Sequence, residues 1–111
     1  MLLNKDIVVL KKILAEIQVI DDTVGNATFS VFDKTETIKR TVAMTMINIG
    51  ELTRHLSEDF KKSEKEIPFK AIMATRHVAA HEYQELRFDD IWEAVKKDIP
   101  KMKKRITFLL K

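Results

Sequence analysis

The stretch TRHVAAHEYQ, residues 75–84, concentrates the side chains of this sequence that are best suited to proton transfer and phosphate binding. It holds an arginine, two of the three histidines of the chain and its single tyrosine. Histidine titrates near neutral pH, so it can accept a proton from one oxygen and donate one to another. Arginine stays charged and presents a planar fork that suits phosphate oxygens. Acid/base chemistry on a phosphodiester, with no metal ion, is therefore one interpretation of this stretch.

The spacing within the stretch restricts that chemistry. His77 and His81 are four residues apart and would share one face of a continuous helix, as would Arg76 and Tyr83 at a spacing of seven. Arg76 and His81 are five apart, so on a regular helix they point about 140° apart. They can work on one phosphate only if the helix ends near His81, if the arginine side chain curls round, or if a second subunit completes the site.

Two other interpretations of these residues stay open. Histidines at this spacing can bind a metal ion, but no glutamate directly follows His77 and no third ligand is apparent, so we expect no metal site. Alternatively, His77 and His81 cap the C-terminal end of a helix, where positive charge is favourable, and Tyr83 packs with its hydroxyl group hydrogen-bonded. Spacing alone does not decide between this structural role and acid/base chemistry.

Length and composition limit the class of protein. The 111 residues are expected to form one domain, residues 1–111, with a hydrophobic core. Hydrophobic residues make up 45% and charged residues 33%, with only two glycines and two prolines, which favours helices. The chain has no cysteine, so it forms neither disulfide bonds nor cysteine-based zinc sites. No uncharged stretch is long enough to cross a bilayer and the N-terminus is too charged for a signal peptide, which predicts a cytoplasmic protein with no membrane partner.

The helices that must position these residues are indicated by apolar residues at helical spacing. We expect a first helix from a cap at Asn4 to Val24 and a long second helix from a cap at Asp33 to Phe60, with GNATFSVF as the connection between them. A third helix starts at Pro68 and runs into the histidine stretch. A fourth starts at about residue 91, and Pro100 kinks it or begins a fifth, nearly end to end with it. No strand signal is present, which predicts an all-α protein, an antiparallel four- to five-helix bundle.

The run RHVAAHEY resembles the motif of HEPN domains, which is an arginine, a polar residue, three variable residues and a histidine. With INIGEL, EIPFKAIMATRH and LRFDDIWEAVKKDIPKMK, it makes nearly the whole chain similar to the HepT-like toxins, HEPN proteins that are partners of small MntA-type nucleotidyltransferase antitoxins. The resemblance implies the HEPN fold and a homodimer in which two copies of the motif face a shared cleft. It also implies a metal-independent endoribonuclease with RNA as substrate and no cofactor.

Carried over position by position, the resemblance gives each residue a role. Arg76 would stabilise the phosphate and His81 would be the general acid/base. His77 takes the polar position, as a second proton carrier or an orienting hydrogen-bond partner. Tyr83 matches the tyrosine to which the antitoxin adds AMP, which would put charge and bulk beside the cleft and exclude RNA. The alternative is a catalytically silent subunit that binds nucleotide or RNA and serves the nucleotidyltransferase.

Gly50, Glu51 and Trp92 are three further positions with expected structural roles. Gly50 lies in mid-helix, where glycine costs about 1 kcal/mol relative to alanine, so we expect it to permit a close helix contact. Glu51 follows it and, by resemblance, matches a glycine–glutamate pair of the family. It either supports the site by an ion pair with Arg76 or Arg54, or has only a surface role. Trp92 is expected in the core or at a dimer contact.

The C-terminal part of the chain is strongly basic although the net charge of the whole is only +3. From Lys96 onward seven basic residues stand against Asp98 alone: Lys96, Lys97, Lys101, Lys103, Lys104, Arg105 and Lys111. This run is either the solvent-exposed face of the last helix or a binding surface for RNA or another phosphate.

Overall fold

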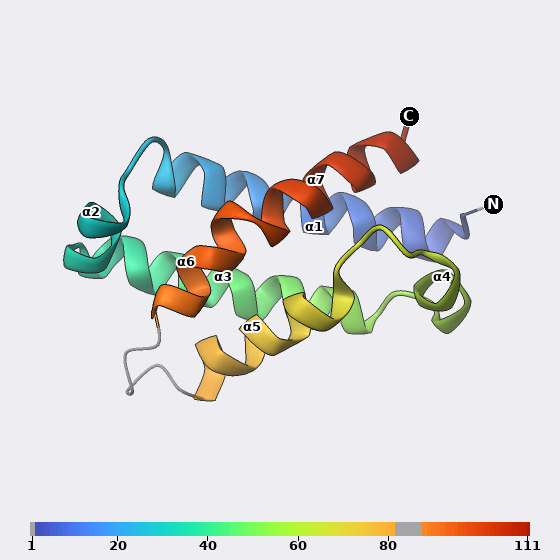
Figure 1. The fold of residues 1–111 in the computed structure, drawn as a ribbon. Coiled ribbons are helices and arrows are strands. Elements are labelled where there is room, and N and C mark those ends of the chain that lie inside the picture. Colours follow the sequence, from blue (N-terminus) through green and yellow to red (C-terminus); the bar gives the residue numbers. More distant parts are fainter. Residues whose placement is uncertain (1, 82–87) are drawn as a thin grey trace.

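The computed structural model describes residues 2–81 and 88–111, and all regular secondary structure in these ranges is helical (Figure 1). The helices are α1 (Asn4–Val24), α2 (Phe29–Lys34), α3 (Glu36–Arg54), α4 (Glu58–Ser63), α5 (Phe69–His81), α6 (Phe88–Lys96) and α7 (Asp98–Leu109). The prediction of an all-α bundle is confirmed, and the six-residue helices α2 and α4 supplement the longer ones. Within the described ranges, no helix is long and apolar enough to span a membrane.

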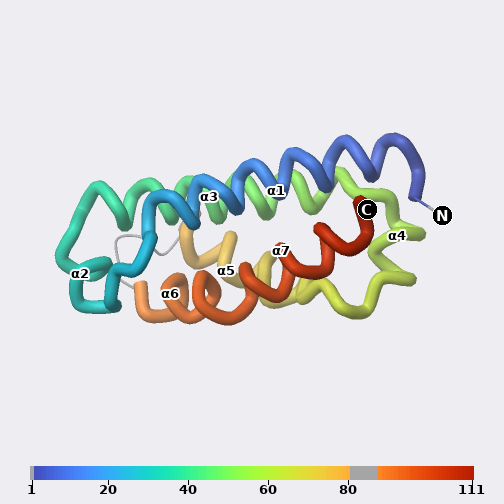
Figure 2. The backbone as a smooth tube through the Cα atoms, turned by 90° about the horizontal axis from the view of Figure 1, so that it is seen from above, coloured from blue at the N-terminus to red at the C-terminus, as the bar shows by residue number. Residues whose placement is uncertain are grey.

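The long helices form two layers. Figure 2 shows α1 and α3 side by side, with α5, α6 and α7 together on one side of them. α3 packs against both α1 and α5, and α7 returns across α1. α6 and α7 follow one another nearly end to end, as predicted, with only Lys97 between them. This arrangement leaves α3 in contact with the helix that carries the histidine stretch.

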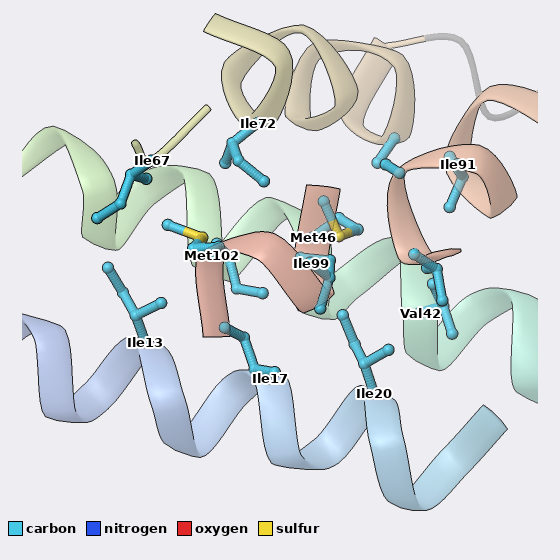
Figure 3. Close-up of a cluster of buried hydrophobic side chains, with 14 of the residues drawn as sticks. Ile13, Ile17, Ile20, Val42, Met46, Ile67, Ile72, Ile91, Ile99 and Met102 are labelled. Atoms are coloured by element: carbon cyan, nitrogen blue, oxygen red, sulfur yellow. The ribbon is translucent and has the colours of Figure 1, made fainter. Parts of the chain in front are cut away.

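The hydrophobic core fills the space between the layers. Apolar residues three or four positions apart lie on one face of a helix, and α1, α3 and α7 turn such faces toward one another (Figure 3). Each buried isoleucine side chain in such a core contributes roughly 1.5–3 kcal/mol. The residues that are at most 1% exposed here include Ile13, Ile17, Ile20, Val42, Met46, Ile72, Ile91, Ile99 and Met102.

Trp92 packs inside its own chain. Its ring centroid lies 4.9 Å from that of Phe32 and 6.0 Å from that of Phe29, and Phe32 in turn meets Phe88 at 6.1 Å. These distances are typical of favourable aromatic pairs. The core role expected for Trp92 is therefore confirmed, and the cluster holds α2 against the start of α6.

Three predicted helix starts are wrong, and one of them is the start of the fourth helix, which lies at Phe88 and not at about residue 91. Asp33 lies inside α2 and does not cap the next helix. α2 begins earlier in the chain, where Thr28 caps it: the Thr28 hydroxyl oxygen accepts a hydrogen bond from the Val31 backbone N–H at 3.3 Å. α3 then begins after Thr35. At the N-terminus the helix also starts one residue early, with Asn4 as its first residue.

The expected long second helix divides in two. α3 ends at Arg54, and the Ser57 hydroxyl oxygen caps α4 by accepting a hydrogen bond from the Phe60 backbone N–H at 3.2 Å. Ser57 is itself held by the buried Asp6, which accepts from its backbone N–H at 2.8 Å and from its hydroxyl at 2.7 Å. This contact fastens α4 to the first turn of α1.

Candidate active site

α3 and α5 cross at Gly50, where the Arg76 side chain passes over α3. A Cβ atom at position 50 would lie 2.6 Å from the Cβ and 3.3 Å from the Cδ of Arg76, and closer still to its Cγ. Real Cβ atoms essentially never approach other atoms below 3.0 Å. The expectation that Gly50 permits a close helix contact is confirmed, and the structure adds that the contact is with Arg76.

Glu51 holds the end of the Arg76 side chain. Nη2 of Arg76 donates a hydrogen bond to Oε1 of Glu51 at 2.5 Å, and Nη1 of Arg54 donates to its two oxygens at 3.2 and 3.3 Å. Both ion pairs that the sequence allowed are therefore present. The Arg76 side chain is 26% exposed and that of Arg54 is 62% exposed, so the pair with Arg76 is the better shielded from solvent.

The ion pair favours the ionised form of Glu51. The hydrogen bond from Arg76 lowers the pKa of Glu51 from its usual value of 4.5, desolvation opposes this, and Arg54 adds to the lowering. Glu51 is consequently ionised at neutral pH, and it restrains the Arg76 guanidinium group without neutralising it by proton transfer.

One donor of Arg76 has no acceptor. Its Nε atom is shielded from solvent and makes no hydrogen bond to any residue in the described ranges, whereas its Nη2 is bound to Glu51. A shielded donor without an acceptor costs about 1–3 kcal/mol. The guanidinium group thus retains hydrogen-bonding capacity that Glu51 does not use.

The other predicted residues of the motif are placed less fully. His77 is exposed on α5, and His81 is the final residue of the same helix. Arg76 and His81 belong to one continuous helix, so their backbone positions are about 140° apart around the helix axis, as expected for a regular helix. The side chain of His81 and the whole of Tyr83 lie outside the described part of the chain, so their roles stay predictions.

A groove borders Glu51 on the side of α1. It has a volume of about 450 Å³ and includes the third histidine of the chain, His55, just after the end of α3. Its other lining residues are Lys12, Ala15, Glu16, Asn48, Glu51 and Leu52. Sequence analysis missed this groove because its walls come from two helices that share no local spacing.

Among the described residues, no three His, Asp or Glu side chains are grouped closely enough to hold a metal ion.

Comparison with known proteins places the chain in a family. The sequence profile of the family described as Ribonuclease HepT-like matches residues 13–109. The chain belongs to this HepT-like family. The resemblance inferred from the motif is thereby confirmed at the level of the family.

Two relatives of this HepT-like chain align with it over most of their length. A protein of Caldanaerobacter subterraneus subsp. tengcongensis named "Putative RNase TTE0752" is 29% identical over 101 residues, which are 91% of this chain and 90% of that protein. A protein of Thermococcus cleftensis named "Probable ribonuclease HepT" is 28% identical over 102 residues, 92% of this chain and 93% of the relative. No solved structure matches the chain with significance.

Proposed function

We propose that this HepT-like chain is an endoribonuclease that acts as a homodimer and needs no metal ion. The observation that carries the proposal is the passage of Arg76 over Gly50 to Glu51. The glycine leaves room for the side chain, which is 26% exposed, and the glutamate restrains its far end, while the guanidinium group stays charged. Such a preorganised cation suits the charge that develops on a phosphate during cleavage. Membership of the Ribonuclease HepT-like family supports RNA as the substrate.

The proposed reaction uses the ribose 2′-hydroxyl of RNA as nucleophile. One His81 takes its proton, the 2′-oxygen forms a bond to phosphorus, and the bond from phosphorus to the 5′-oxygen breaks. A protonated histidine gives its proton to that leaving oxygen, so the products are a 2′,3′-cyclic phosphate and a free 5′-hydroxyl. Arg76 stabilises the transition state, in which the non-bridging oxygens gain charge.

A homodimer resolves the geometric conflict within one chain. Arg76 and His81 point about 140° apart on one helix, so a single α5 does not readily turn both onto one phosphate. Two copies of α5 facing each other supply two histidines and two arginines to one cleft. One histidine then serves as base and the other as acid, and His77 supports them by orienting a proton carrier.

The proposed partner is a nucleotidyltransferase antitoxin that modifies Tyr83. Transfer of AMP joins the tyrosine oxygen to the α-phosphorus of ATP and releases pyrophosphate. The product adds negative charge and bulk two residues from His81, which opposes the approach of RNA. Intact-mass measurement after co-expression tests this step: we expect the mass of one added AMP in the parent chain and none in Tyr83→Phe. An unmodified parent chain would contradict it.

Growth after expression without the antitoxin tests the ribonuclease proposal against a silent binding subunit. We expect the parent chain to stop growth and Arg76→Ala to abolish that effect. Arg54→Ala is the matched control, because Arg54 also pairs with Glu51 but is 62% exposed. If the folded parent chain is harmless, the alternative is favoured, a subunit that binds nucleotide or RNA without cleaving it.

A further inference from the structure

α7 carries an exposed stripe of lysines that is interrupted by one aromatic ring. Spacings of three and four residues place Lys101, Lys104 and Phe108 on one face of the helix, and Lys97 precedes and Lys111 follows the helix at the same spacings. The phenylalanine of the stripe is 61% exposed, whereas Ile99, Met102 and Ile106 on the other side of α7 are buried. We call the exposed members the α7 stripe: Lys97, Lys101, Lys104, Phe108 and Lys111.

The lysines of the α7 stripe differ from Lys103 and Arg105 in forming no ion pair with the described residues. Lys103 forms an ion pair with Asp21 at 2.6 Å, and Arg105 forms ion pairs with Glu64 and Glu66, both at 3.0 Å. In the described ranges, none of the four stripe lysines has a carboxylate within ion-pair distance. Like charges one helical turn apart repel each other. A polyanion bound along the stripe would remove that repulsion.

The ring of Phe108 is held in place for stacking. The guanidinium group of Arg105 lies 5.2 Å from the ring centroid, and Nε and Nη2 of Arg105 donate to the buried Glu64 carboxylate, each at 3.0 Å. Arg105 is therefore anchored, and it covers one part of the ring through a cation–π contact. Hollows of about 410 and 430 Å³ adjoin Phe108, and Lys104 lines both of them.

We propose that the α7 stripe binds single-stranded RNA, with phosphates on the lysines and a base stacked on Phe108. Grooves for single strands combine positive charge along the backbone with aromatic rings that stack on bases, and a base in a duplex does not offer its face to a ring. The stripe belongs to a different helix from Arg76 and Glu51, so it extends RNA contacts beyond the candidate active site. The choice of RNA as ligand rests on the proposed ribonuclease function.

The test measures binding of a short fluorescent single-stranded RNA by fluorescence anisotropy at several salt concentrations. All proteins carry His81→Ala so that the RNA stays intact, and circular dichroism verifies that each is folded. The stripe variant combines Lys101→Gln, Lys104→Gln and Lys111→Gln. The control combines Lys5→Gln, Lys11→Gln and Lys34→Gln, three exposed lysines that form no ion pair with described residues. Both variants lose three positive charges.

We expect the stripe variant to bind at least about tenfold more weakly, and the slope of log K against log salt to fall in magnitude by about 2, because each phosphate contact on a single strand contributes about 0.7. The control should bind within about twofold of the parent. Phe108→Leu keeps an apolar side chain but removes the ring, and it should weaken binding about fivefold or more, while Phe108→Tyr should preserve it.

If both triple variants bind RNA equally more weakly than the parent, the loss is explained by net charge alone, and the proposal is overturned. Unchanged RNA binding by the stripe variant would overturn it too, and if that variant then failed to bind the nucleotidyltransferase, the stripe would be a protein contact. Cleavage is measured separately on chains that retain His81. A parent chain that binds RNA through the stripe but never cuts it would refute the ribonuclease proposal and leave this one standing. If the parent chain cuts RNA and the stripe variant binds RNA as strongly as the control does, only the proposal of RNA binding by the α7 stripe is refuted.

Discussion

The Cβ atom of Arg76 lies 2.6 Å from the position that a Cβ atom on residue 50 would take. The start of the Arg76 side chain thus occupies the place that a side chain at position 50 would need, so that only glycine fits there. Glycine in mid-helix costs about 1 kcal/mol relative to alanine. In this protein the glycine allows the Arg76 side chain to cross α3 and reach Glu51. Nη2 of Arg76 lies 2.5 Å from Oε1 of Glu51.

Gly50→Ala is expected to destabilise the protein by about 1–3 kcal/mol, as overpacking of a filled site does. Alanine favours helices, so without the contact to Arg76 the same substitution would raise stability. Thermal unfolding, followed by circular dichroism, measures the effect. An unchanged or higher Tm, together with unchanged RNA cleavage, would show that Gly50 does not set the path of Arg76.

Glu51→Gln is expected to lower kcat/KM for RNA cleavage roughly 10- to 100-fold, because the glutamine lacks the charge that holds Arg76 in place and small displacements of a catalytic group are costly. Arg54→Gln is the matched control, since it removes the other partner of Glu51 and leaves the pair with Arg76 intact. Equal losses in the two variants would argue against a positioning role for Glu51.

The pH dependence of cleavage is expected to come from histidine and not from Glu51. The hydrogen bond from Arg76 lowers the pKa of Glu51, so the stability from this pair is complete above the unfolded pKa of about 4.5 and is lost only as the pH falls through the lower folded value. Histidine is the side chain whose ordinary pKa lies between about pH 5 and 8. The midpoints of the kcat/KM profile should therefore be the same in Glu51→Gln as in the parent, at lower amplitude. A shifted midpoint would contradict this assignment.

Asp6→Ala is expected to lower the free energy of unfolding by about 2 kcal/mol or more, because two hydrogen bonds to a buried carboxylate are lost. Ser57 then keeps no anchor on α1. Urea denaturation measures the change, with Asp22→Ala as control, an exposed aspartate that accepts from the exposed Gln18 at 2.9 Å. Equal stability of the two variants would mean that the link from α1 to α4 contributes little.

The longer helices could be predicted from the sequence, whereas the six-residue helices α2 and α4 and several helix ends could not. Apolar spacing identifies a helix because a buried face repeats every three or four residues. An end depends on which polar side chain finds a backbone partner. Asp33 satisfied the local pattern of a cap but lies inside α2, and Ser57 is held by Asp6, 51 positions away in the sequence. Contacts over that distance leave no mark on local spacing.

The possible partners of Glu51 could be named from the sequence, but their arrangement could not be predicted. Both Arg54 and Arg76 were possible partners of Glu51, and only the crossing of α3 and α5 shows that it binds both. The same limit applies to the basic segment. Lys103 is occupied by Asp21 of α1, 82 positions away, while Lys104 beside it is free of any ion pair with the described residues.

Cleavage of single-stranded RNA by the purified chain in the presence of EDTA tests the central claim most directly. We predict that the parent chain cuts RNA and leaves a 2′,3′-cyclic phosphate, and that Arg76→Ala and His81→Ala each lower kcat/KM by about 100-fold or more. A His81→Ala variant that is folded and cleaves RNA as fast as the parent would contradict the claim.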